Sequence, residues 1–313
     1  MSNPPQAGLL SQIDSEHVQS RETPEWWSWL VLGLVHAICL GVFFVGWSWV
    51  ALAAALGSYM LRMFAISAFY HRFFSHRTYK THRWAQFVFA MIGCSTCQQG
   101  PLFWAANHRH HHQYSDQPED IHSPRQQGFF HSHIGWIPKQ QNAPSKLGLI
   151  PDFNKFPELR WLDQNHIVFP FLLGAAMYFL GWGLESLWPS LGTSPLQMLI
   201  WGFFVPTVLV WHATFTINSV SHVYGSKRYA TDDDSRNNFW FALLTGGEGW
   251  HNNHHYYATS VRQGFYWWEI DMTYYVLKAF SKIGLVWDLK YIPAHLKEKH
   301  LHKDLDKPIA LTD

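Results

Sequence analysis

The stretch SYMLRMFAISAFYHRFFSH, residues 58–76, carries an apolar segment directly into the histidine pair His71 and His76. About 20 mainly apolar residues are enough to cross a bilayer as a helix. The apolar segment begins well upstream, so that the span covers residues 47–70 and the histidines follow at its end. The sequence therefore predicts a membrane helix that leads into a histidine-rich polar region.

Three more apolar runs have the length of a membrane helix. They are residues 26–46, 168–188 and 196–217. Short loops join the first run to 47–70 and the third to the fourth, which indicates two helical hairpins. We expect a single-domain (1–313), all-α, multi-pass membrane protein with four transmembrane helices and a helical cap. The polar parts are an N-terminal tail, residues 1–25, and a cap built from residues 71–167 and 218–300.

The composition agrees with a bilayer environment. Charged residues make up 14% of the chain and aromatic residues 17%, whereas a soluble domain carries about 25% charged residues. The net charge is +1, so nothing favours a nucleic-acid partner. Histidine is abundant, with 21 residues, and histidine is common where metals bind or protons move.

Lysine and arginine predict the orientation. The two hairpin loops, near Gly46 and at 184–195, contain neither residue, whereas the cap contains most of them. By the positive-inside rule, both termini and the cap are cytosolic, in a bacterial inner membrane or the endoplasmic reticulum. Arg62 lies inside the second span, where a charge is a functional candidate. The alternative is that the end of this long span projects into the cap, where Arg62 pairs with a polar group.

The histidines recur in a pattern that suits metal binding. Two H-x-x-H-H groups, HRHHH and HNNHH, place histidines at i, i+3 and i+4, on one face of a helix. They contain His108, His111 and His112, and His251, His254 and His255. The five-residue spacing of His71 and His76 is off a single α-helical face, so we expect one of the two to come from the helix end. Asn218 and His222 are i and i+4 at the end of the last span.

We expect these groups to converge on two metal ions, although one such group alone could be a polar helix surface. Nine imidazoles are too many for one ion. Imidazole suits zinc, copper, iron and nickel, but a two-ion nitrogen site facing an apolar interior favours oxygen activation by iron over hydrolysis by zinc. The carboxylates of Asp116 and Glu248 lie near the second and third groups in sequence and could hold the free N–H of a ligand. Alternatively, each lies in a solvated loop.

The order of these motifs resembles the membrane fatty-acid desaturases, specifically the acyl-CoA (stearoyl-CoA, delta-9) group. The flanking segments YHRFFSHRTYKT, NSVSHVYGSKRY and GEGWHNNHH are also similar to that group. The resemblance implies a di-iron centre that uses dioxygen and two electrons to place a cis double bond in a saturated acyl chain. The implied iron ligands are His71, His76, His108, His111, His112, His222, His251, His254 and His255, with Asn218 acting through a water.

The resemblance also implies an acyl tunnel. Its bend matches Gln98, Trp104 and Thr214, and its end matches Tyr59, with Met63 one turn further along. Two contacts differ. Ala106-Asn107 stands where the family has an Arg-Asp pair that contacts CoA. Phe215 replaces the tryptophan that holds the acyl carbonyl, and Gln99 stands for an asparagine that shares this task. Acyl-CoA is the first expectation for the substrate, with an acyl carrier protein or a phospholipid as alternatives.

The HPGG haem motif of a fused cytochrome b5 domain is not found in the sequence. We therefore expect an external electron donor, ferredoxin-like or cytochrome b5-like. Two other functions remain open at this point. A related fatty-acid hydroxylase or alkane monooxygenase would use the same metals, and a membrane zinc hydrolase or metal-binding transporter would use different ones.

Overall fold

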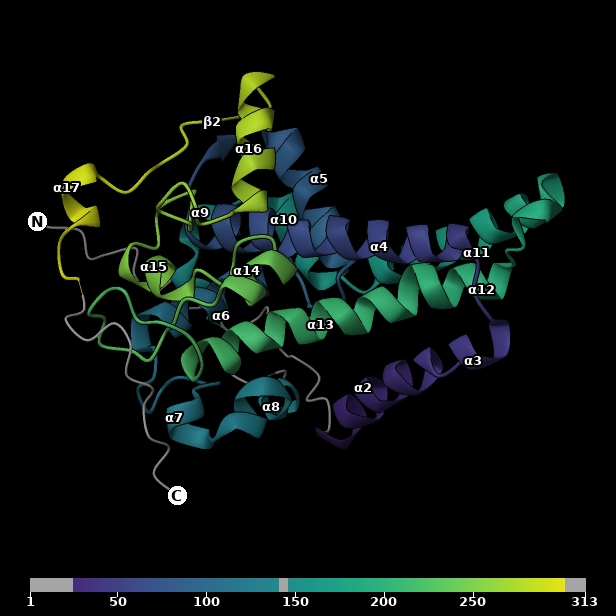
Figure 1. Ribbon diagram of the computed structural model, residues 1–313, viewed down its shortest axis with the longest axis horizontal. Coiled ribbons are helices and arrows are strands. Elements are labelled where there is room, and N and C mark those ends of the chain that lie inside the picture. The colour runs from purple at the N-terminus through teal and green to yellow at the C-terminus, as the bar shows by residue number, and fades with distance from the viewer. Residues whose placement is uncertain (1–24, 141–145, 302–313) are drawn as a thin grey trace, which may run out of the picture.

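A computed structural model describes residues 25–140 and 146–301, so the expected tail, residues 1–25, lies outside the described residues except for Glu25. Four helical segments are long and apolar enough to cross a membrane, as predicted. They are Glu25–Val45, Trp49–Ser75, Val168–Leu187 and Pro195–His222. Figure 1 shows these long helices side by side at one end of the molecule, with the shorter helices gathered at the other.

Three of the four membrane segments consist of more than one helix, and the second and fourth segments each contain a π-helix. The first segment is α2 (Glu25–Cys39) and α3 (Val42–Val45), and the second is α4 (Trp49–Phe64) followed by the π-helix η1 (Ala65–Ser75). The third is α11 (Val168–Leu187). The fourth runs through α12 (Pro195–Leu199), the π-helix η5 (Ile200–Phe204), α13 (Val205–Asn218) and the 3-10 helix η6 (Val220–His222).

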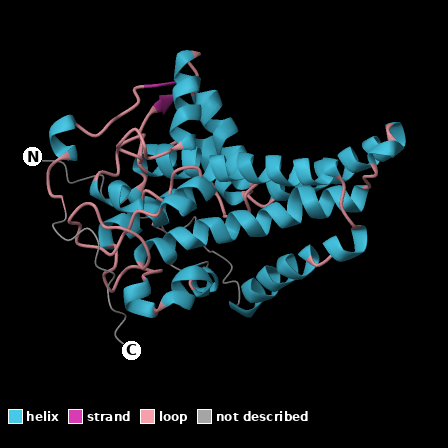
Figure 2. Cartoon of the chain, viewed as in Figure 1, coloured by secondary structure: helices cyan, strands magenta, loops and turns pink. Residues whose placement is uncertain are grey.

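The cap consists of short helices and one small sheet, and helix dominates the described chain (Figure 2). Its longer helices are α5 (Arg83–Cys94), α6 (Pro101–Tyr114), α10 (Pro157–Gln164) and α16 (Met272–Lys282). The shorter ones are α7 (Pro124–Gln127), η2 (His131–Gly135), α8 (Ile137–Gln140), η3 (Leu147–Leu149), α9 (Pro151–Asn154), α14 (Phe239–Leu244), α15 (His251–Tyr256) and α17 (Ala294–Lys297). A last 3-10 turn, η4 (Pro189–Leu191), lies in the loop after α11. Strands β1 (Lys80–Thr81) and β2 (Val286–Trp287) pair antiparallel.

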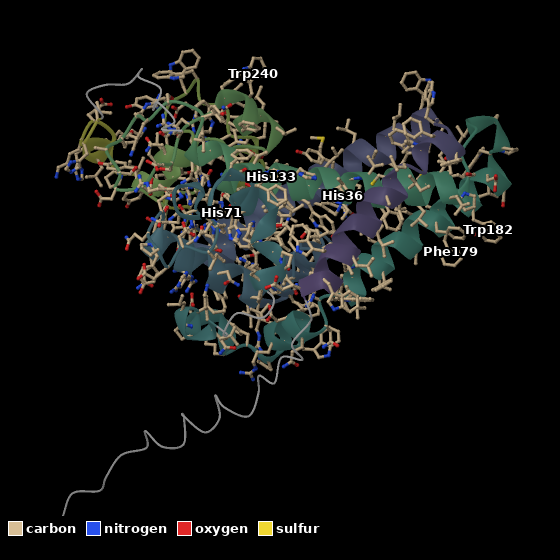
Figure 3. All side chains as sticks on the ribbon, turned by 90° about the horizontal axis from the view of Figure 1, so that it is seen from below. His36, His71, His133, Phe179, Trp182 and Trp240 are labelled. Atoms are coloured by element: carbon tan, nitrogen blue, oxygen red, sulfur yellow. The ribbon has the colours of Figure 1, made fainter. Side chains whose placement is uncertain are left out.

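The outward faces of the membrane helices are apolar. Phe44 on α3 is 89% exposed, and Phe179 and Trp182 on α11 are 63% and 60% exposed. Figure 3 shows Phe179 and Trp182 pointing away from the ribbon. Large exposed apolar surfaces are unusual on a soluble monomer and are typical of a surface that contacts lipid or protein. This surface is that of a membrane protein.

Polar contacts hold the hairpins together at the end away from the cap. Ser48 caps the start of α4 by accepting a hydrogen bond from the Ala51 amide, and its hydroxyl donates to Oε1 of Gln197 at 2.8 Å. The Gln197 amide donates in turn to the carbonyl of Val45 at 3.1 Å. One glutamine side chain on α12 therefore ties both ends of the loop between α3 and α4 to the second hairpin.

A chain of imidazoles connects α2 to the rest of the bundle. The Nε2 atoms of His36 and His212 lie 2.9 Å apart, and Nδ1 of His212 lies 2.9 Å from Nε2 of His133. Since Nδ1 of His36 faces the carbonyl of Leu32, which can only accept, that nitrogen carries the proton. These bonds link α2, α13 and η2, and the first two of these elements border the cavity described below.

Arg62 is fully buried between helices, and its polar partners come from the last membrane segment and from Ser95 at the end of the cap helix α5. Its guanidinium donates to the hydroxyl of Thr207 at 2.8 Å, the carbonyl of Phe203 at 3.0 Å and the carbonyl of Ser95 at 3.3 Å. Phe203 belongs to η5, where the change from π- to α-helical turns alters the backbone hydrogen-bond pattern. Arg62 therefore stabilises irregular backbone inside the membrane, where an unpaired carbonyl is costly.

We predict that Arg62→Met lowers the free energy of unfolding by about 2 kcal/mol, because three hydrogen bonds in a membrane protein are lost at roughly 0.6 kcal/mol each. Unfolding by increasing detergent denaturant measures this. Ser58→Ala is the matched control, since Ser58 lies one turn away on α4 and its buried hydroxyl has no partner among the described residues. Equal unfolding midpoints for the two variants would show that Arg62 does not brace η5.

Candidate metal centre and adjoining cavity

Four elements bring histidine side chains together where the membrane helices enter the cap. The π-helix η1 and its C-cap carry the H-x-x-x-x-H pair, and α6 carries the first H-x-x-H-H group. The 3-10 helix η6 carries His222, and α15 carries the second H-x-x-H-H group. Helix α6 packs directly on η1. His71, labelled in Figure 3, lies within the cap end of the molecule, far along the bundle from Trp182.

The nine predicted histidines fall into two groups, in each of which the candidate ligand atoms all lie within 4.8 Å of one another. The first group is His71, His76, His108, His112 and His254. The second is His111, His222, His251 and His255. Each H-x-x-H-H helix contributes to both groups, so the two groups are neighbours.

The spacing inside each group suits a metal ion. Nε2 of His254 lies 2.9 Å from Nε2 of His71 and 3.0 Å from Nε2 of His112. In the second group, the Nε2 atoms of His222 and His251 are 3.0 Å apart. Two nitrogens bound to one ion at ~2.1 Å, at right angles, lie ~3 Å apart. Nε2 of His255 is buried without a hydrogen-bond partner among the described residues, as a nitrogen reserved for an ion would be.

The π-helix η1 explains the five-residue spacing of His71 and His76. The amide of His76 donates to the carbonyl of His71 at 3.2 Å, the i to i+5 bond of a π-turn. Residues five apart share one face in this geometry, so both imidazoles point into the first group. His71 lies within η1 and His76 is its C-cap residue, so one of the two histidines does come from the helix end, as expected. Arg109 on α6 fixes this end by donating to the carbonyls of Phe74 and Ser75, both at 2.8 Å.

Four buried carboxylates hold the opposite nitrogen, Nδ1, of four of these histidines. Asp116 accepts from His222 at 2.8 Å, and Glu248 accepts from His71. Asp120 accepts from His111 at 3.0 Å, and Asp233 accepts from His255 at 2.7 Å. A carboxylate in this place fixes the tautomer and turns Nε2 toward the metal. Sequence reasoning singled out Asp116 and Glu248 and missed Asp120 and Asp233.

Glu248 is itself held from several directions. Arg72 donates to its Oε1 at 3.1 Å from Nη2, and Gln263 donates to its Oε2 at 3.0 Å. The hydroxyl of Ser67 also donates to Glu248. Arg72 is anchored on its other side by Asp271 at 3.0 Å. This network places a negative charge behind His71 and prevents the carboxylate from turning away.

The site keeps its carboxylates ionised and most of its imidazoles neutral. Burial alone would raise the pKa of Asp116 and of Asp233, but hydrogen bonds and the electrostatic interaction with His222 and His255 hold both pKa values well below the usual range. Burial, together with the neighbouring imidazoles, lowers the pKa of His108 and His254 far below that of a free histidine. Neutral imidazole is the form that binds a metal.

His122 is a further histidine that sequence reasoning did not single out. With His111 and Asp120 it forms a third set of potential ligand atoms within 4.8 Å. Burial lowers the pKa of His122 to about 3, so the ring is neutral. Its Nδ1 lies 3.5 Å from Asp120, and its ring borders the cavity. No pattern in the sequence marks it, because it stands alone in a polar loop.

A cavity of about 1010 Å³ adjoins the first group. Its walls come from α2, the start of α6, α11, η5 and α13, and they are mainly apolar. Among the residues expected at the tunnel, five line it: Gln98, Gln99, Trp104, Thr214 and Phe215. His108 and Asn218 also line it, so the cavity reaches the metal-binding groups. Gln98 donates to Thr214 at 2.9 Å and accepts from Trp104 at 3.3 Å, which makes the three side chains one fixed wall.

Tyr59 and Met63, expected at the end of the tunnel, are not among the described residues that line this cavity. The hydroxyl of Tyr59 donates to the carbonyl of Leu244 at 2.7 Å, and Met63 is buried in the main hydrophobic core. That face of α4 packs against protein. Leu199 and Phe203 line the cavity instead, at the opposite end of the α12–α13 helix from Asn218.

We predict that Asp233→Ala lowers metal affinity about 10- to 100-fold, because His255 loses the carboxylate that orients it. Competition with a chelator measures the affinity. Asp234→Ala is the matched control, since the adjacent carboxylate pairs with Arg125 at the surface and not with an imidazole. If both variants retained metal equally well, the orienting role of Asp233 would be wrong.

Comparison with known proteins identifies the family of the chain. A family model described as fatty acid desaturase matches residues 47–288. A chloroplastic palmitoyl-monogalactosyldiacylglycerol delta-7 desaturase of Arabidopsis thaliana is 34% identical over 81% of this chain and 66% of its own length, so the chain spans slightly less than two thirds of that relative. An sn-1 stearoyl-lipid 9-desaturase of Synechocystis sp. is 36% identical, with 87% of this chain and 82% of the relative covered. An acyl-CoA 5-desaturase of Anemone leveillei is 34% identical, with 87% and 81% covered. The chain belongs to the fatty acid desaturase family.

Proposed function

We propose that the protein is a membrane di-iron desaturase that removes two hydrogens from a saturated fatty acyl chain and leaves a cis double bond. One observation carries this proposal: nine imidazoles lie in two groups at the side of a long apolar cavity. An unactivated carbon chain fits the cavity, and the imidazoles could hold two ions beside it. The ions would supply the redox chemistry by which dioxygen takes up the two hydrogens and, with two electrons from the donor and two protons, is reduced to two waters.

Iron fits this site better than zinc. Zinc has no redox chemistry, and its catalytic sites use three protein ligands and a water. Each group here offers four or five imidazoles. The proposed ligands are the nine histidines, and Asn218, which lines the cavity four residues before His222, is proposed to act through a water. A desaturase removes hydrogen and a zinc hydrolase does not, so the family also favours a redox metal.

The protein's own residues position the acyl chain and exclude water. The cavity lies at the large end of the range for ligand pockets, about 300–1,000 Å³. Gln98, Trp104 and Thr214 form a hydrogen-bonded wall near His108 that would set the bend of the chain. The polar groups of this wall form hydrogen bonds with one another, so the acyl chain would contact mostly apolar surface.

The cavity supports an acyl-lipid substrate more than acyl-CoA, although acyl-CoA is the first expectation from the sequence. Among the described residues that line it there is no lysine or arginine, and the several phosphate charges of CoA call for such groups. The relatives do not decide the point, since one is named for a stearoyl-lipid and another for an acyl-CoA. We propose a neutral lipid ester as the carrier of the acyl chain.

The position of the double bond, the donor and the orientation belong to the same proposal. The flanking motifs and the stearoyl-lipid 9-desaturase support the delta-9 position, while other relatives are named for positions 5 and 7. The lysine and arginine distribution supports a cytosolic metal site with both termini on that side. A ferredoxin-like or cytochrome b5-like protein would then deliver electrons from the cytosol.

We predict that a host without its own desaturase, when it expresses this chain, accumulates cis-9 monounsaturated acyl chains in its membrane lipids only when oxygen is present. Gas chromatography with mass spectrometry locates the double bond. The His254→Ala variant, which loses one member of the first group, should give none of this product. A product heavier by one oxygen would show a hydroxylase, and purified protein that binds zinc and needs no oxygen would show a hydrolase.

A further inference from the structure

The indole N–H of Trp136 is buried in the cavity wall and has no acceptor among the described residues. Trp136 follows η2 directly and precedes α8. Two other tryptophans of the same wall are satisfied. Trp104 donates to Gln98 at 3.3 Å, and Trp211 donates to the carbonyl of Thr96 at 3.2 Å. Trp136 is therefore the exception among these three.

A buried N–H without an acceptor is costly, because the group loses its bond to water and gains nothing in return. Buried tryptophan N–H groups usually find a partner for this reason. When such a group borders a ligand cavity, the ligand is the natural source of the acceptor. The cavity is mainly apolar, so an oxygen that a ligand placed here would gain a hydrogen bond that most of the wall does not offer.

The side chains around Trp136 indicate which part of a ligand would accept a hydrogen bond from its N–H. Its ring lies 5.2 Å from the ring of His122 and 6.3 Å from that of Phe215, centre to centre. The His122 ring lies 4.5 Å from that of His111, a member of the second metal-binding group. An oxygen bound at Trp136 would thus lie near the metal-binding groups, with the His122 ring between it and His111. Phe215 offers no hydrogen-bond donor of its own.

Several other polar groups of the wall are already used. Gln98 bonds to both Thr214 and Trp104, the amide of Asn107 donates to the carbonyl of Phe103 at 2.9 Å, and Nδ1 of His166 faces the carbonyl of Asp163 at 2.8 Å. Gln99 is the rival donor, since it lines the cavity and is expected near the carbonyl from the sequence.

We propose that the indole N–H of Trp136 donates a hydrogen bond to the carbonyl oxygen of the bound acyl ester. This rests on the proposed function. Held at that oxygen, the acyl chain runs past His108 and Asn218 toward Leu199 and Phe203, and its carbonyl end has a fixed distance from the metal site. Trp136 is a positioning residue that selects an ester over a chain without a carbonyl.

The test compares two lipids that differ by that oxygen, monostearoylglycerol and its octadecyl ether. Binding to the iron-loaded protein is measured by titration in bicelles, without oxygen or reductant, so that no turnover occurs. The parent protein should bind the ester about 3- to 10-fold more tightly, the value of one hydrogen bond. Trp136→Phe, which keeps an aromatic ring and removes the donor, should bind both lipids equally.

Trp211→Phe is the matched control, because its N–H bonds to backbone and its loss should leave the ester preference intact. Iron content per chain verifies that each variant is folded. A Trp136→Phe protein that keeps the ester preference overturns the proposal, and loss of the preference in Gln99→Leu alone assigns the carbonyl to Gln99. A parent protein that binds the ester but forms no unsaturated product contradicts the proposed function and leaves the role of Trp136 standing.

Discussion

Nine imidazoles must converge at the end of an apolar helix bundle without repelling one another, and this constraint shapes both halves of the molecule. Protonated rings at Nε2 separations near 3.0 Å would be strongly unfavourable in a buried site. Burial and the neighbouring imidazoles lower the pKa of rings such as those of His108 and His254, which favours their neutral form. Four of the rings are oriented by carboxylates, which belong to Asp116, Asp120, Asp233 and Glu248. Two divalent ions would balance those four negative charges.

The membrane helices meet this constraint through irregular turns and not through straight α-helices. The π-helix η1 turns His71 and His76 onto one face just where the second span enters the cap. The π-helix η5 in the last span lies against Arg62, whose guanidinium bonds to its backbone. Both deviations occur in long apolar segments, where nothing but protein or lipid surrounds the backbone. Of the two, η1 contributes to the metal-binding groups, whereas η5 lies against Arg62.

Much of the fold and of the candidate site was predictable from the sequence, because both depend on local patterns. Apolar length predicts the four spans, and i, i+3, i+4 spacing predicts the H-x-x-H-H faces. The π-turns were not predictable, since no residue type in 65–75 demands them. Asp120 and Asp233 were missed because they stand in polar loops among other carboxylates. Asp233 is twenty-two residues from His255 in the chain. Tyr59 and Met63 share a helix face, but spacing alone does not say what that face packs against.

The most direct test of the central claim is to locate the metal ions. Anomalous diffraction at the iron absorption edge, on crystals of iron-loaded protein, measures where iron lies. We predict two peaks, one surrounded by His71, His76, His108, His112 and His254 and one by His111, His222, His251 and His255. A single peak, or a peak held by His111, Asp120 and His122 in place of the second group, would contradict this account.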